Sequence, residues 1–190
     1  MIGNHSKANF EHMKLPLEDL SVRHPGLTKS IGESYLEAAS VCLNRHHSSP
    51  TEMAAACNGR SVDCLAEWSE PDARALRAWA NDIDTTEAGA YGVSLAAVEA
   101  IDGLVAVRRA ETLTGADYYV APIGSNPDDL ENCFRLEVSG VSAGNKATVE
   151  ARLRDKLKQT TKGKSNLPAI ASVIGFKERM IAIAKMSDRK

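Results

Sequence analysis

The sequence lacks the features that would by themselves indicate a membrane or secreted protein. No apolar run approaches the roughly 18 residues of a membrane-spanning helix, and the opening MIGNHSKANFEHMK has no signal-peptide core. The net charge is only -2 over 190 residues, so overall charge does not demand a polyanionic partner. We expect a cytoplasmic protein with no membrane partner and a chain long enough for one substantial core.

Cysteine is also scarce, and the four cysteines are scattered. Cys42 and His46 are spaced i, i+4, and Cys57 and Cys64 follow, but this spacing matches no standard zinc pattern. Buried reduced thiols among apolar neighbours are the preferred interpretation, and a zinc site is the alternative.

Charge is unevenly distributed along the chain. Residues 1–145 hold 11 Lys and Arg against 21 Asp and Glu, a balance of -10, and residues 146–190 hold 12 against 4, a balance of +8. A basic C-terminal quarter suits a phosphate-bearing substrate. The alternative is that these residues solvate a helix and the chain end.

Residues 1–84 predict a helical N-terminal region. Apolar residues recur at helical spacing from Ile31 to Leu43, and further helices are predicted near 51–58 and over 61–82.

Residues 85–190 predict a second unit that mixes helices and strands. A helix over 85–102 ends at Gly103, a natural C-cap. Gly89 and Gly92 within it lower its intrinsic stability but would let another backbone approach closely. The elements that follow are strands over 104–107, 117–121 and 134–139, a helix over 145–159, and a hairpin over 169–176 and 179–185. This order predicts an α/β (α+β) fold.

Two strands each carry one acid. Asp117 opens the first, and Glu137 lies inside the second within Leu136-Glu137-Val138. A carboxylate within a strand is costly to bury unless it is paired or binds a cation. Two acids on neighbouring strands can hold a hard divalent metal. The alternative is structural: Asp117 ends a turn, and Glu137 pairs with Arg135.

This arrangement resembles the PD-(D/E)XK superfamily of restriction-endonuclease-like nucleases over residues 85–185. The resemblance implies a mixed sheet flanked by helices and Mg²⁺ (or Mn²⁺) bound by Asp117, Glu137 and the Val138 carbonyl. Glu87 would assist from the preceding helix, with Glu99 in reserve. The resemblance also suggests an effector of a bacterial antiviral defence or restriction-type system.

One position departs from the family pattern. Ser139 stands where the family usually has Lys, and serine cannot supply its charge. On the helix over 145–159, Lys146 and Lys156 fall within roughly 60° of the apolar stripe, so both could project toward the acids. We expect Lys156 to supply the cation. The alternative is that these lysines lie along the edge of the stripe with their charge in water.

The leading hypothesis is a metal-dependent nuclease acting on nucleic acid, with DNA ahead of RNA. Contacts to the phosphate backbone are expected from basic residues of the C-terminal quarter and from Arg108 and Arg109. Alternatives are an inactive nuclease-fold subunit that binds nucleic acid or protein, and a protein–protein module; the N-terminal helices would serve a homodimer or protein partner. In the C-terminal quarter, the residues expected to contact the phosphate backbone are Arg152, Lys158, Lys162 and Lys164.

Overall fold

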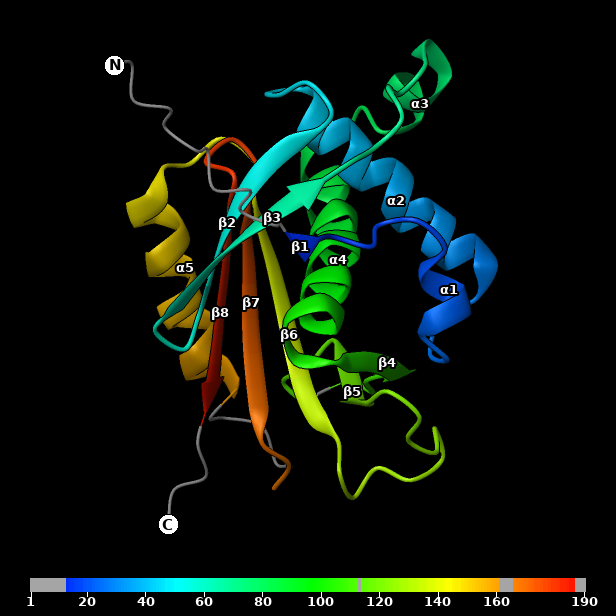
Figure 1. The fold of residues 1–190 in the computed structure, drawn as a ribbon, viewed down its shortest axis with the longest axis vertical. Helices are drawn as coiled ribbons and strands as arrows, with labels where there is room; N and C mark the ends of the chain where they lie inside the picture. The colour runs from blue at the N-terminus through cyan, green and yellow to red at the C-terminus, as the bar shows by residue number, and fades with distance from the viewer. Residues whose placement is uncertain (1–12, 113, 161–165, 187–190) are drawn as a thin grey trace, which may run out of the picture.

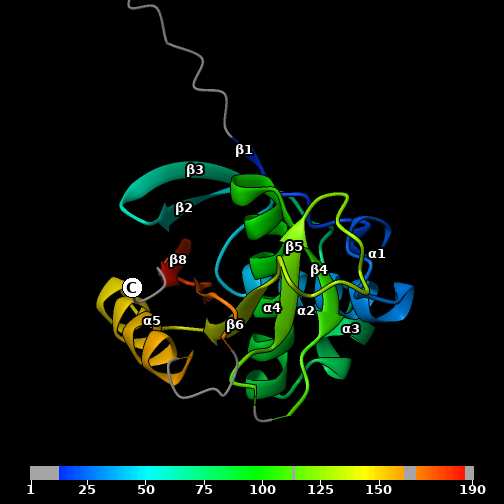
Figure 2. The same ribbon diagram turned by 90° about the horizontal axis from the view of Figure 1, so that it is seen from below.

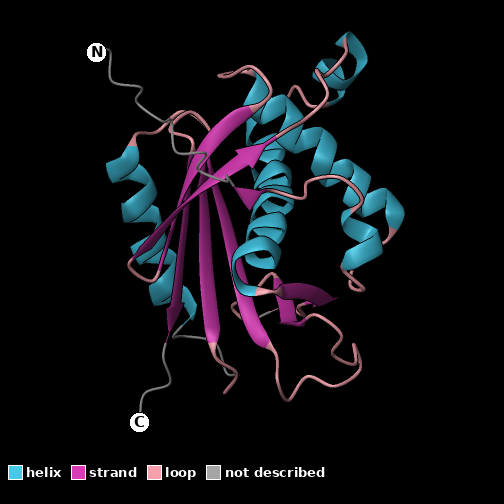
Figure 3. Ribbon diagram, in the orientation of Figure 1, coloured by secondary structure: helices cyan, strands magenta, loops and turns pink. Residues whose placement is uncertain are grey.

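The fold is one eight-stranded mixed sheet with helices on both faces, in a computed structural model that describes residues 13–112, 114–160 and 166–186 (Figures 1 and 3). The strand order is β1-β3-β2-β8-β7-β6-β5-β4. The strands are β1 (Met13–Lys14), β2 (Thr51–Cys57), β3 (Arg60–Ala66), β4 (Leu104–Arg109), β5 (Tyr118–Pro122), β6 (Phe134–Val141), β7 (Ala169–Gly175) and β8 (Met180–Met186). The helices are α1 (Leu20–Arg23), α2 (Lys29–Asn44), α3 (Ala73–Ala78), α4 (Asp82–Asp102) and α5 (Lys146–Thr160).

The C-terminal part follows the predicted element order from α4 to β8. Asn81 caps α4 by accepting from the N–H groups of Ile83 and Asp84, and Gly103 closes it in a left-handed conformation with φ 65°. Strands β4, β5 and β6 are antiparallel neighbours, whereas β6 and β7 are parallel and joined through α5. The predicted helix, strands and C-terminal hairpin are therefore confirmed in this half.

Helices α4 and α5 cover opposite faces of the sheet, and Figure 2 shows strands lying between them. Helix α2 packs on α4 and forms a second helical layer beyond it. A Cβ on Gly89 would lie 3.1 Å from the Ala38 carbonyl oxygen, and one on Gly92 would lie 3.0 Å from that of Tyr35. The expected close approach of a second backbone at these glycines is confirmed.

Residues 51–66 correct the prediction of a helical N-terminal region. They form the β2–β3 hairpin, turning at Asn58-Gly59, where φ is 48° and 81°. Strand β2 also pairs in parallel with β8, so the N-terminal part contributes to the same sheet. The Ala-rich stretch Thr51–Cys57 has residues of good helix propensity, but ladder bonds on both sides of β2 override that preference. Helix α3 is likewise shorter than the helix predicted over 61–82.

The outer edge of β4 is closed by residues before α2. The N–H of Gly26 donates to the Ala106 carbonyl at 2.9 Å, and the N–H of Ala106 donates to Nδ1 of His24 at 2.9 Å. Since Nδ1 is an acceptor, the ring proton is on Nε2, which lies 3.0 Å from Oε2 of Glu99. The fully buried His24 therefore links this edge of the sheet to α4.

No helix in the described ranges is long and apolar enough to cross a membrane.

Candidate active site at the open edge of strand β6

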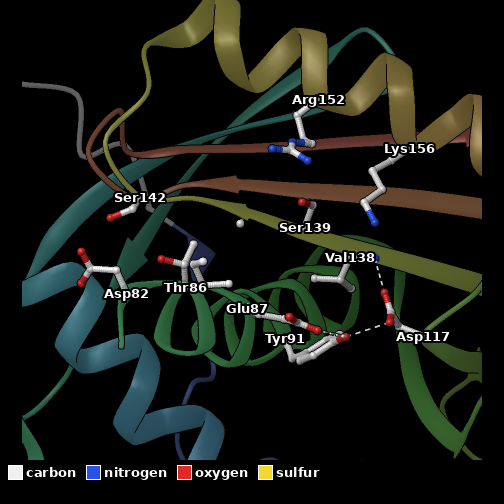
Figure 4. Close-up of a pocket in the computed structure, with 12 residues that line it drawn as sticks. Asp82, Thr86, Glu87, Tyr91, Asp117, Val138, Ser139, Ser142, Arg152 and Lys156 are labelled. Atoms are coloured by element: carbon white, nitrogen blue, oxygen red, sulfur yellow. Dashed lines mark hydrogen bonds between the residues drawn. The ribbon is translucent and has the colours of Figure 1, made fainter. Parts of the chain in front are cut away.

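A cavity of about 460 Å³ opens where β5 and β6 separate. Strand β5 pairs with β6 only as far as Tyr118 opposite Leu136, so the following part of β6 has no ladder partner in β5. Helix α4 forms one wall, and α5 forms the other (Figure 4). The lining residues are Asp82, Ile83, Thr86, Glu87, Tyr91, Asp117, Val138, Ser139, Gly140, Ser142, Arg152 and Lys156.

Asp117 lies at the point of separation, immediately before β5. Its N–H still donates to the Leu136 carbonyl at 2.8 Å. Its Oδ2 accepts from the N–H of Val138 at 2.8 Å, and its Oδ1 accepts from the Tyr91 hydroxyl at 2.8 Å. The carboxylate thus satisfies a backbone group of β6 that the ladder with β5 no longer reaches.

Glu137 does not line the cavity and projects toward α5, on the face of the sheet opposite α4. Its Oε1 lies 2.6 Å from Nζ of Lys156 on α5, and these side chains are 11% and 18% exposed, respectively. Leu136 and Val138, on either side of Glu137, belong instead to the core beneath α4. The structure therefore places the Lys156 cation directly against the strand acid, as expected from the position of Lys156 on its helix.

Of the two α4 acids expected to assist, Glu87 and Glu99, only Glu87 lines the cavity. Its Oε1 lies 3.2 Å from the Tyr91 hydroxyl. Glu99 lies away from the cavity, 2.6 Å from Nε of Arg23 and 3.0 Å from Nε2 of His24. Glu87 is thus the helix acid that the structure places beside Asp117.

The basic residues expected to contact phosphate do not all lie at the cavity. Arg152 lines the cavity from α5. Lys158 is 78% exposed on the same helix, 3.9 Å from Asp155, and does not line the cavity. Lys146 pairs with Glu150 at 3.9 Å. Lys162 and Lys164 lie outside the residues that the structure describes.

Tyr91 is the residue that sequence reasoning missed at the site, and Arg109, which was expected only as a phosphate contact, lies against it. The Arg109 guanidinium lies 4.5 Å from the Tyr91 ring centroid and 4.7 Å from that of Tyr118, and its Nη2 donates to the Tyr91 hydroxyl at 3.0 Å. Burial, followed by the charge of Asp117, raises the pKa of Tyr91, so its hydroxyl keeps its proton at neutral pH. The i, i+4 spacing of Glu87 and Tyr91 was the available sequence signal.

The oxygen donors at this site suit a hard cation but do not form a complete cage. Among residues 13–112, 114–160 and 166–186, no three His, Cys, Asp or Glu side chains are grouped to hold a metal ion. Mg²⁺ commonly takes one or two carboxylates and completes its shell with water and substrate phosphate. Asp117 and Val138 line the cavity and fit that description by donor type. Glu137 has the same donor type but does not line the cavity, and Lys156 already contacts one of its oxygens.

All four cysteines are free and buried, and within the described ranges none belongs to a group of three His, Cys, Asp or Glu side chains that could hold a metal. Comparison with known protein families, curated proteins and solved structures finds no match for this chain. Its own residues therefore supply the basis for a functional assignment.

Proposed function

We propose that this chain is a nuclease of the restriction-endonuclease-like kind that uses Mg²⁺ or Mn²⁺ to hydrolyse phosphodiester bonds. The carrying observation is that one cavity is lined by Asp117, Val138, Lys156 and Glu87, which come from separate elements of the chain. The element order α4-β4-β5-β6-α5-β7 supports the same assignment by analogy with that superfamily.

Each residue has a role that its position suggests. Asp117 and the Val138 carbonyl would hold the ion from the cavity wall, and Glu137, which does not line the cavity, is the third oxygen donor that the resemblance implies. A metal bound there supplies an acidified water and offsets phosphate charge. Lys156 lines the cavity and would stabilise the charge that develops on the phosphate, in place of the Lys that Ser139 replaces. Glu87 lies close enough to accept a proton from a water in the cavity.

Nucleic acid, with DNA ahead of RNA, is the proposed substrate. Arg152 lines the same wall as Lys156 and is exposed to solvent, so it can contact a backbone phosphate next to the reacting one. Such contacts add affinity that falls with salt and carry no base specificity.

The test is cleavage of plasmid, linear duplex, single-stranded DNA and RNA with Mg²⁺ or Mn²⁺, with and without excess EDTA. Asp117→Asn and Glu137→Gln should each abolish cutting. Glu111→Gln is the matched control, since this carboxylate accepts a bond from Tyr119 at 3.2 Å and does not line the cavity. Cutting that survives EDTA or both site substitutions would refute the proposal.

One observation favours a second candidate, a nuclease-fold subunit without catalysis. Lys156 already contacts the Glu137 carboxylate, and Ser139 offers no charge of its own. Such a subunit would bind nucleic acid with a steep salt dependence and show no metal-dependent cutting. Binding that is lost in Arg152→Ala while no substrate is cut would support this candidate.

A further inference from the structure

The Asp117 carboxylate is held by donors from three other elements. Val138 of β6 donates to Oδ2, and Tyr91 of α4 donates to Oδ1, each at 2.8 Å. Nη2 of Arg109, on β4, lies 3.5 Å from the same Oδ1. Because both oxygens are fixed by different elements, the carboxylate cannot rotate without breaking one of these bonds.

The direction of the Tyr91 proton follows from its neighbours. Arg109 can only donate, so its bond of 3.0 Å uses an acceptor site on the Tyr91 oxygen. A phenol has a single proton, and the remaining neighbours are the Asp117 and Glu87 carboxylates at 2.8 and 3.2 Å. The shorter contact assigns the proton to Asp117.

The donor itself is rigidly supported. Tyr91 is 6% exposed, and its ring packs against Tyr35 and Tyr118 at centroid distances of 5.3 and 5.9 Å. The hydroxyls of Tyr35 and Tyr118 lie 2.7 Å apart, which joins α2 to β5 behind the site. The Tyr91 hydroxyl therefore has little freedom to leave Asp117.

We infer that Tyr91, with its proton directed by Arg109, is a positioning residue that holds Asp117 ready for a divalent cation and so sets the metal affinity of the site. This inference rests on the proposed function. Partners that orient metal ligands typically change metal affinity 10- to 100-fold when they are removed. Tyr91 does not need to touch substrate for this effect.

The experiment is calorimetric titration of Mn²⁺ into wild type, Tyr91→Phe and Asp117→Asn, with Tyr119→Phe as the matched control. Tyr119 is also 6% exposed and donates to a carboxylate, that of Glu111, away from the cavity. Tyr91→Phe should weaken Mn²⁺ binding about tenfold, while Tyr119→Phe should leave it unchanged. In the cleavage assay, excess Mg²⁺ should restore the kcat of Tyr91→Phe.

The same Mn²⁺ titration of Arg109→Met is a second test, and it remains available if Tyr91→Phe does not fold. Loss of a cation beside Asp117 would by electrostatics alone strengthen Mn²⁺ binding, so weaker binding in a folded variant indicates lost orientation. Wild-type affinity in Tyr91→Phe, or tighter binding in Arg109→Met, overturns the positioning role and leaves the nuclease proposal intact. Failure of wild type to bind Mn²⁺, or unchanged binding in Asp117→Asn, overturns the metal site and the inference together.

Discussion

Lys156 on α5 and Glu137 on β6 form a close ion pair, Nζ to Oε1, at 2.6 Å. Both side chains are less than one-fifth exposed, so solvent screens their interaction weakly. The pair joins the helix on one face of the sheet to the strand that borders the cavity. A residue proposed for catalysis is thus also expected to contribute to stability.

Lys156→Met should lower the free energy of unfolding by about 3 kcal/mol, because it leaves a buried carboxylate without its partner. Lys146→Met is the control: its 68% exposed side chain lies 3.9 Å from Glu150, and we expect a change below about 0.5 kcal/mol. Urea denaturation at neutral pH measures both. The double variant Lys156→Met with Glu137→Leu should recover most of the loss, and equal losses in the two lysine variants would contradict the prediction.

Stability should fall as pH drops below about 6.5, the ordinary pKa of histidine. Burial lowers the pKa of His24 in the folded protein, with Glu99 acting in the opposite direction. The unfolded chain therefore takes up the proton at a higher pH, and protonation of the folded state would cost the bond from Ala106 to Nδ1. Above that pH, His24 contributes no pH dependence.

Urea unfolding between pH 5 and 8 tests this prediction, with a slope of at most about 1.4 kcal/mol per pH unit from one proton. His24→Gln should reduce the fall in unfolding free energy on the acid side of this pH range. Burial also lowers the pKa of His46, which accounts for the slope that remains. A fall of unchanged steepness in His24→Gln would assign the effect to other groups.

Gly140→Ala should destabilise the protein by about 1–3 kcal/mol through overpacking. The added Cβ would lie 2.5 Å from the carbonyl oxygen of Thr86, so α4 would have to move away from β6. The same movement would deform the cavity that both elements line. Thermal denaturation compares it with Ser139→Ala on the neighbouring residue of the same strand, which should change stability by less than about 0.5 kcal/mol.

The four thiols should react slowly in the native protein. Burial raises the pKa of Cys42 to about 12 and that of Cys64 to about 11, and burial also raises the pKa values of Cys57 and Cys133. Since the thiolate is the reactive form, Ellman's reagent at pH 8 should find no fast thiol until guanidinium is added. A single fast-reacting cysteine would show that one site opens readily.

The C-terminal half was predictable because its local signals agree with its packing. Gly103 ends α4 as its cap position indicates, and the strands after it have clear β-favouring runs. The β2–β3 hairpin was predicted as helix because Thr51–Cys57 is rich in helix formers. Asn58-Gly59 is a two-residue hairpin signal and was the available evidence. The alternating burial of β2 could not be read from the sequence, because residues 53–57 are all apolar.

The site was partly predictable for a similar reason. Asp117 and Glu137 stand out as acids within strands, and the helical angle of Lys156 directs it toward them. The contacts of Tyr91 with Asp117 and Arg109 depend on how α4 sits against β4 and β5. No local pattern specifies that distance, so these contacts emerged only from the fold.

The parallel pairing of β2 with β8 has a consequence for how the chain reaches its folded state. As the protein is synthesised, the β2–β3 hairpin emerges early, yet the strand that pairs with Ala54–Cys57 comes near the end of the described chain. One edge of the hairpin must therefore wait without its partner, and insertion of β8 between β7 and β2 is a late step. A ribosome-bound nascent chain that stops before Met180 should leave this edge open to chaperones or to other nascent chains.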